Sequence, residues 1–144
     1  MSFDLSKLDT ADEAEQGTTM DVRHPLTGEV LLTPEGTPVT ITLLAEDSTS
    51  YRRAQHRAQN RRFSKGSLNK LKAEELENDQ LEIYAAVTRA WSGLAFGEED
   101  LPCTRSNALA LYRREGFKWL VDQIADFVKD RANFLPSSAK PSPS

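Results

Sequence analysis

The chain has 144 residues and a formal net charge of −4, and 38% of its residues are hydrophobic. This length suits one compact domain rather than two large ones. No apolar run approaches the roughly 18 residues that a membrane-spanning helix needs, and the N-terminus has no secretory signal, so we expect neither a membrane nor a secreted protein. A single cysteine excludes an intrachain disulfide and fits a reducing compartment.

Charge is divided into blocks along the chain. Residues 1–50 carry ten acidic and two basic residues, residues 51–72 carry eight basic and no acidic residues, and residues 73–144 carry twelve acidic and eight basic residues. Such blocks favour contact between opposite charges, within the chain or with a partner. They also disfavour non-specific binding of nucleic acid by the whole protein.

The first part of the chain predicts an arm followed by a hairpin. Residues 1–20 are polar, acidic and without a sustained period, which predicts a disordered arm. Within residues 21–47, two β-rich runs at 29–33 and 38–44 flank a proline–glycine turn and predict a β-hairpin. A lone hairpin is only marginally stable in water, so this one either docks on the helices or pairs between chains through its edge at 39–44.

A helical domain is expected over residues 48–135. Its core should lie at 79–135, which holds both tryptophans and four of the six phenylalanines. Capping residues such as Ser48 and Thr104, and the terminating Gly93, set the predicted helix ends. The predicted helices cover residues 49–63, 68–93, 105–114 and 117–133.

The predicted fold class is therefore mainly α, with about four helices, an N-terminal β-hairpin and disordered termini. The proline- and serine-rich residues 136–144 predict a flexible tail.

Three arginines recur at helical spacing in the predicted helix 49–63. Arg53, Arg57 and Arg61 lie at i, i+4 and i+8 and form a basic face. This face is either a solvated surface that pairs with the chain's own acidic residues, or a site for an acidic protein partner or for nucleic acid. Nucleic acid is the least favoured partner, because no defined nucleic-acid-binding module is present.

Catalytic and metal-binding patterns are missing from the sequence. The two histidines, His24 and His56, and Cys103 lie far apart and show no metal-ligand spacing. The acidic triplet at 98–100 is most simply a solvated loop, and no glycine-rich phosphate loop occurs. We therefore expect no enzyme, no cofactor and no metal site.

Two blocks of sequence carry a resemblance to a known family. The first is HPLTGEVLLTPEGTPVTITLLAEDSTSYRRAQHR, and the second is AVTRAWSGLAF followed by CTRSNALALY and QIADFVKDRANFL. In this order, over residues 21–135, they resemble the tail assembly chaperones of long-tailed bacteriophages.

The resemblance implies a non-enzymatic, mostly helical protein made in the host cytoplasm and absent from the mature virion. Such proteins coat the tape measure protein and keep it soluble until tail tube subunits assemble around it. Family members often also occur as a longer, frameshifted product that engages the tail tube protein. The resemblance implies no active site.

A chaperone for a long helical client needs an exposed apolar surface rimmed by charge. Large side chains on the predicted helices are the candidates, although each of them would equally suit a core position. The client-binding candidates are Leu68, Leu71, Leu76, Tyr84, Trp91, Phe117 and Leu120. A homo-oligomer is a further hypothesis.

Two other classes of protein stay open. One is a structural virion protein, such as a tail-completion or head–tail joining subunit, which would remain in the finished particle. The other is a small nucleic-acid-binding regulator that uses the basic face of residues 53–61, and its binding would weaken steeply with salt.

Overall fold

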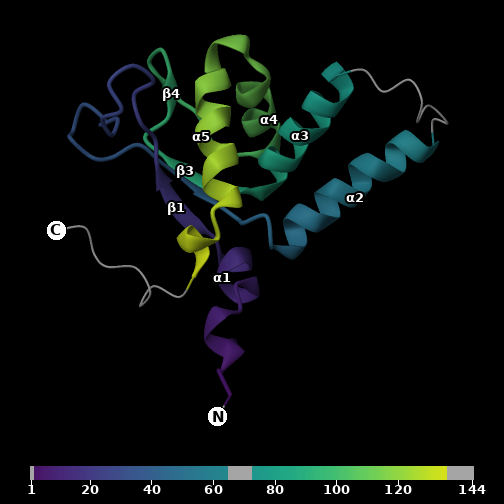
Figure 1. Cartoon of the computed structure of the whole chain (residues 1–144). Helices are drawn as coiled ribbons and strands as arrows, with labels where there is room; N and C mark the ends of the chain where they lie inside the picture. The colour runs from purple at the N-terminus through teal and green to yellow at the C-terminus, as the bar shows by residue number, and fades with distance from the viewer. Residues whose placement is uncertain (1, 65–72, 136–144) are drawn as a thin grey trace.

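The computed structural model describes residues 2–64 and 73–135. These residues form a helix-rich fold with a small antiparallel sheet, so the fold is mixed rather than purely helical (Figure 1). The α-helices are α1 (Ala11–Gln16), α2 (Thr49–Ser64), α3 (Ala73–Val87), α4 (Arg105–Arg113) and α5 (Lys118–Lys129). Short 3-10 turns lie at η1 (Leu5–Leu8), η3 (Glu115–Phe117) and η4 (Arg131–Phe134). The strands are β1 (Thr18–Asp21), β2 (Thr40–Leu43), β3 (Thr88–Ser92), β4 (Ala95–Phe96) and β5 (Glu99–Asp100).

Strand β2 is the centre of the main sheet. The strand order is β1-β2-β3 and both pairings are antiparallel, with Ile41 opposite Met20 on one side and opposite Trp91 on the other. Both edges of β2 are therefore occupied within the chain. The predicted use of residues 39–44 as a free edge for pairing between chains is wrong for this reason.

The N-terminal segment is not an arm without regular structure over its whole length. Residues 18–21 form β1, and Ala14 on α1 is fully buried beside Ala45 and Phe134. The prediction of a disordered arm is wrong for residues 11–16 and 18–21. A six-residue helix and a four-residue strand in which only Met20 is buried are too short to give a periodic hydrophobic pattern in the sequence.

The turn at residues 34–37 is confirmed, but the predicted pairing of the two runs is only partly correct. Thr33 N donates to Thr37 O and Gly36 N donates to Thr33 O, both at 2.8 Å. Residues 29–33 make only isolated bridges, Val30 with Arg23 and Leu32 with Pro38. The second run contains β2, which pairs with β1 on one edge and with β3 on the other instead of with residues 29–33. These two pairings satisfy the backbone of β2, in which Ile41 is completely buried.

Local capping signals predicted two helix starts correctly. Tyr51 N donates to Ser48 Oγ at 3.1 Å at the start of α2, and Asn107 N donates to Thr104 Oγ1 at 3.1 Å at the start of α4. The predicted helix 68–93 is wrong at its C-terminal end, because the chain leaves α3 after Val87 and continues as β3. Over residues 88–92 the chain forms a strand because it pairs with β2, although the hydrophobic pattern of the sequence there fits a helix. The start of that predicted helix lies outside the described residues, as does the predicted tail 136–144.

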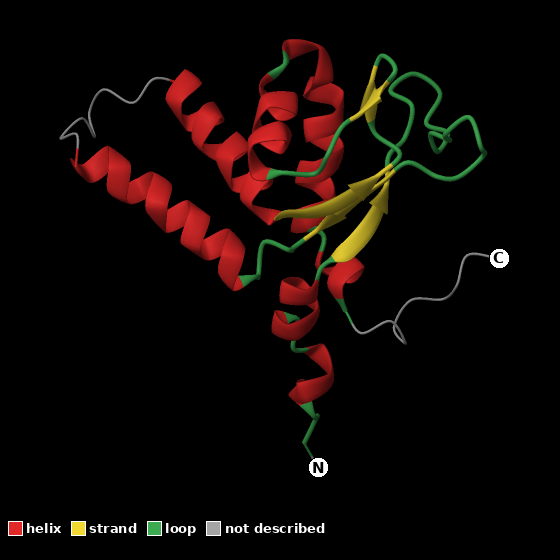
Figure 2. Cartoon of the chain, turned by 180° about the vertical axis from the view of Figure 1, so that it is seen from behind, coloured by secondary structure: helices red, strands yellow, loops and turns green. Residues whose placement is uncertain are grey.

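Helices α3, α4 and α5 stand together and pack on one face of the sheet, while α2 runs outward beside α3 (Figures 1 and 2). Ile41 and Leu43 point into this face and are fully buried with Val87 and Ile124. The opposite face carries threonines, and the Oγ1 atoms of Thr19 and Thr42 lie 2.9 Å apart. One face of the sheet is therefore buried under the helices, and the other face is polar.

Gly93 follows β3 with a φ of +83°, and a Cβ atom there would lie 2.8 Å from Thr33 Cγ2. Gly36 has a similar φ of +87°, but no atom lies within 4 Å of its Cβ position. We expect Gly36→Ala to lose about 1 kcal/mol of unfolding free energy from backbone strain. Gly93→Ala should lose at least about 1 kcal/mol more from overpacking. Chemical denaturation measures both, and equal losses would contradict the close packing at Gly93.

Candidate binding groove

A groove of about 440 Å³ lies between α3 and α5 and is closed at one end by the end of α4. Its floor is apolar and its rim is charged. The floor is made by Leu81, Tyr84, Tyr112, Val121 and Ala125, and the rim by Glu77, Gln80, Arg113, Arg114, Glu115, Lys118 and Asp122.

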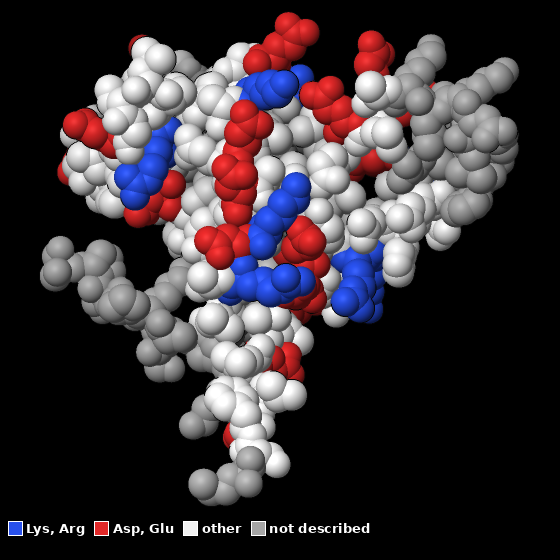
Figure 3. Space-filling model, viewed as in Figure 1, with Lys and Arg blue, Asp and Glu red and all other residues white. Residues whose placement is uncertain are grey.

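Helical periodicity places these side chains together. Leu81 and Tyr84 are three residues apart on α3, and Val121 and Ala125 are four residues apart on α5, so each pair shares a helix face. Leu81, Val121 and Ala125 are only half-buried, so their side chains still meet solvent. Figure 3, which looks onto α5, shows charged side chains of both signs interspersed over this face with uncharged surface between them.

The two tyrosines of the floor carry no charge at neutral pH. Burial raises the pKa of Tyr84 to about 12 and also raises the pKa of Tyr112. The Tyr112 hydroxyl lies 2.7 Å from Thr88 Oγ1, which ties α4 to the start of β3. The floor is therefore neutral, and the groove's charge comes from its rim.

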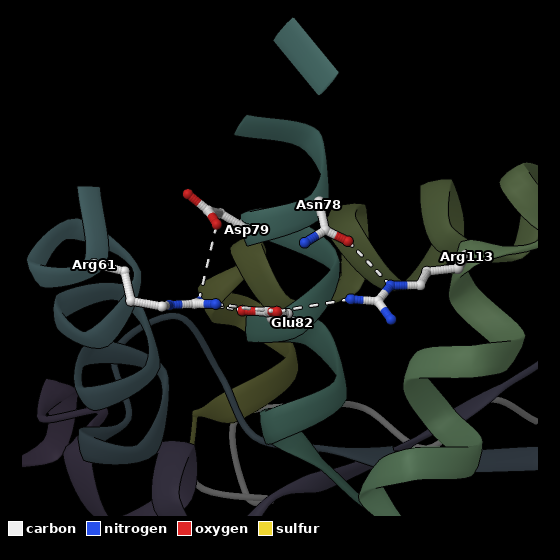
Figure 4. A network of polar contacts seen from close by, with 5 residues as sticks. All are labelled: Arg61, Asn78, Asp79, Glu82 and Arg113. Carbon is white, nitrogen blue, oxygen red and sulfur yellow. Dashed lines mark hydrogen bonds and ion pairs between the residues drawn. The ribbon is translucent and has the colours of Figure 1, made fainter. Parts of the chain in front are cut away.

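A polar network holds α3 between α2 and α4 (Figure 4). Glu82 on α3 is bonded by Arg61 of α2 and lies 3.7 Å from the Arg113 guanidinium of α4. Arg113 Nε also donates to Asn78 Oδ1 at 3.0 Å, and Arg61 lies 3.9 Å from Asp79. The hydrogen bond from Arg61 lowers the pKa of Glu82. One wall of the groove is thus fixed by two arginines from neighbouring helices.

The basic face predicted on α2 is divided by this network. Arg61 pairs with acidic residues of its own chain. This agrees with the interpretation of the basic face as a solvated surface that pairs within the chain. Arg53 and Arg57 are exposed, whereas Tyr51, Ala54 and Ala58, which form the neighbouring stripe on α2, are buried. The face therefore offers fewer free cations to a partner than its sequence suggests.

The predicted client-binding residues do not form one surface. Tyr84 lines the groove but is itself buried, with 3% of its surface exposed, and Leu120 is buried in the core away from the groove lining. Neither is the exposed apolar residue that was predicted. Leu76 is exposed on α3, outside the groove lining. Leu68 and Leu71 lie outside the described residues.

Trp91 and Phe117 belong to the region near the β4–β5 hairpin. Trp91 Nε1 donates to Leu101 O at 2.7 Å. The Phe117 ring lies 5.8 Å from the Phe96 ring and 6.1 Å from that of Trp119, centre to centre. Both candidates are half-buried and already packed within the chain.

Leu81, Val121 and Ala125 were not among the predicted client-binding residues. Their helical periodicity was visible, but the same pattern fits a completely buried face. Only the positions of α3 and α5 show that the floor is left open.

Within residues 2–64 and 73–135, no group of three or more histidine, cysteine, aspartate or glutamate side chains is placed to hold a metal ion. Burial raises the pKa of the Cys103 thiol, which disfavours the thiolate. The absence of catalysis and of cofactors stays a prediction.

Comparison with known proteins gives no relatives: no family model, curated protein or solved structure matches the chain. Among the helices described here, none has the length and apolar character needed to cross a membrane.

Glu82 supplies a testable pH dependence. Its folded-state pKa lies below its ordinary value of 4.5, so its ion pairs stabilise the fold above that pH and are lost as pH falls through the lowered pKa. We expect Glu82→Gln to cost about 1 kcal/mol of unfolding free energy at neutral pH. The difference in unfolding free energy between Glu82→Gln and wild type should shrink as the pH falls through the lowered pKa of Glu82.

Glu98→Gln is the matched control for this measurement, because Glu98 is exposed on the turn between β4 and β5. Denaturant titrations across the acid range measure both variants. A loss in Glu82→Gln that does not change with pH would show that the ion pairs are not its source.

Proposed function

We propose that this chain is a tail assembly chaperone of a long-tailed bacteriophage. It binds the tape measure protein in the groove between α3 and α5, keeps it soluble in the host cytoplasm and helps to recruit tail tube subunits. It acts without catalysis and is absent from the mature virion. The resemblance over residues 21–135 supports the proposed family, and the groove supports the proposed binding site.

The observation that carries the proposal is the half-buried apolar floor between two helices. An amphipathic helix binds in such a groove by inserting residues spaced at i, i+3, i+4 and i+7. The floor residues Leu81, Val121 and Ala125 are the apolar contacts, and Tyr84 closes the bottom. A tape measure protein, being long and helical, offers many segments of this kind.

The rim adds selectivity. It carries Arg113, Arg114 and Lys118 as well as Glu77, Glu115 and Asp122, so neither sign of charge dominates. A client helix whose apolar stripe is flanked by residues of both signs fits this rim. Nucleic acid fits poorly, because acidic residues border the groove and Arg61 is already paired.

Co-expression with the tape measure protein of the same phage tests the proposal. Ala125→Glu places an unpaired charge on the apolar floor, which costs several kcal/mol on client binding unless the charge escapes to water. We expect wild type to keep the client soluble and to co-elute with it in size-exclusion chromatography with light scattering. The variant should leave the client insoluble.

Ala110→Glu is the matched control, because Ala110 is exposed on α4 outside the groove and receives the same substitution. Circular dichroism melting shows whether Ala125→Glu is folded, and Val121→Ser is a milder substitution of the same floor. If the client stays insoluble with wild type, the chaperone proposal fails. Stoichiometric amounts of the chain in purified virions, measured by mass spectrometry, would instead indicate a tail-completion or head–tail joining subunit.

A further inference from the structure

The first residues of the chain form an exposed apolar and acidic arm, residues 2–9. The side chains of Phe3, Leu5 and Leu8 are 73%, 71% and 53% exposed, and Asp4 and Asp9 lie between and beside them. Lys7 is the one basic residue of the segment, whose formal net charge is −1. Both views show this segment leading away from the rest of the molecule (Figures 1 and 2). Three large apolar side chains gathered on one projecting segment are typical of a contact surface.

The base of this arm is fixed to the body beside α2. Thr10 Oγ1 donates to Asp47 Oδ2 at 2.9 Å, and Ser50 Oγ donates to Glu15 Oε2 at 3.0 Å. Ala14 is fully buried at the same place. The arm is therefore presented in a defined direction, away from its own core.

A second feature is an arginine-lined cavity of about 270 Å³ between α2, α3 and α4. Its floor is apolar, because the small side chains of Ala54 and Ala85 leave a hollow beside Leu109. Its walls carry Arg57, Arg61, Arg105 and the single acid Glu82. The cavity is below the size of typical small-molecule sites but accommodates individual side chains.

Among the described residues, the arginines of this cavity outnumber its single acid. Glu82 is bonded by Arg61, and the charge of Arg105 also helps to lower the pKa of Glu82. Neither Arg57 nor Arg105 lies within ion-pair distance of a carboxylate in the described part of the chain. Both side chains are exposed. The cavity therefore favours an acidic ligand that also carries an apolar side chain.

We propose that the arm of one copy docks in the arginine-lined cavity of a second copy. An apolar side chain of the arm covers the alanine floor, and Asp4 and Asp9 pair with Arg57 and Arg105. The acidic, apolar composition of the arm matches the cavity, and the direction of the arm takes it away from its own body. The contact joins two different surfaces, so it forms either a reciprocal dimer or a chain of subunits.

Sedimentation velocity of the isolated full chain over a concentration series tests this contact without any client, so its outcome is separate from that of the proposed function. We expect a mass that rises with concentration and falls with added salt. Leu5→Ser with Leu8→Ser, and Arg57→Glu with Arg105→Glu, should each weaken association by at least about tenfold. Arg53→Glu is the matched control, because Arg53 lies one turn earlier on α2 and does not line the cavity.

A charge exchange gives the sharper test. Asp4→Lys with Asp9→Lys makes the charge of the arm positive, and Arg57→Glu with Arg105→Glu makes the charge of the cavity negative. In each doubly substituted chain the arm and the cavity then have the same sign of charge, so each chain alone should stay monomeric. Mixed together, the two chains should associate, because each arm then meets a cavity of opposite charge. A wild type that is monomeric at every concentration, or a mixture that stays monomeric, would overturn the proposal.

Discussion

Strand β2 receives β1 on one edge and β3 on the other, and the positions of the helices depend on these two pairings. The pairing buries Ile41 and Leu43 completely under the helices. Because α3 runs directly into β3, hydrogen bonding of β3 to β2 sets where α3 ends. On the other side of the groove, the Gln123 side chain of α5 accepts from Arg23 N at 3.0 Å and donates to Arg23 O at 2.9 Å. Both walls of the groove are thus held by the sheet and by the segment between β1 and β2.

The groove is preformed because its walls are fixed independently of any client. Arg61 and Arg113 hold α3 from two sides through Glu82. The backbone of Val128 on α5 accepts from Glu46 N at 3.0 Å, which anchors the end of α5 to the segment after β2. A preformed groove loses less conformational entropy on binding than one that must be ordered by its ligand. A preformed groove suits the proposed function, in which the chain binds many segments of one long client in turn.

The features that the sequence predicted correctly depend on neighbouring residues. The caps at Ser48 and Thr104 and the turn at 34–37 each involve residues at most four positions apart. Strands β1 and β3 were missed because each exists through pairing with β2, far away along the chain. The groove was missed for a related reason. Tyr84 and Leu120 were both client-binding candidates that equally suited the core, and only packing shows that both are buried and that Tyr84 alone also lines the groove. Residues whose type gives little indication of binding in the sequence, such as Ala125, form part of the groove floor.

Amide and methyl chemical-shift mapping by NMR with a synthetic amphipathic helix from the tape measure protein tests client binding in the groove most directly. We expect shift changes concentrated at Leu81, Tyr84, Val121 and Ala125, with saturation as peptide is added. Changes concentrated on the threonine face of the sheet, or no changes with any client segment, would contradict a client-binding groove between α3 and α5.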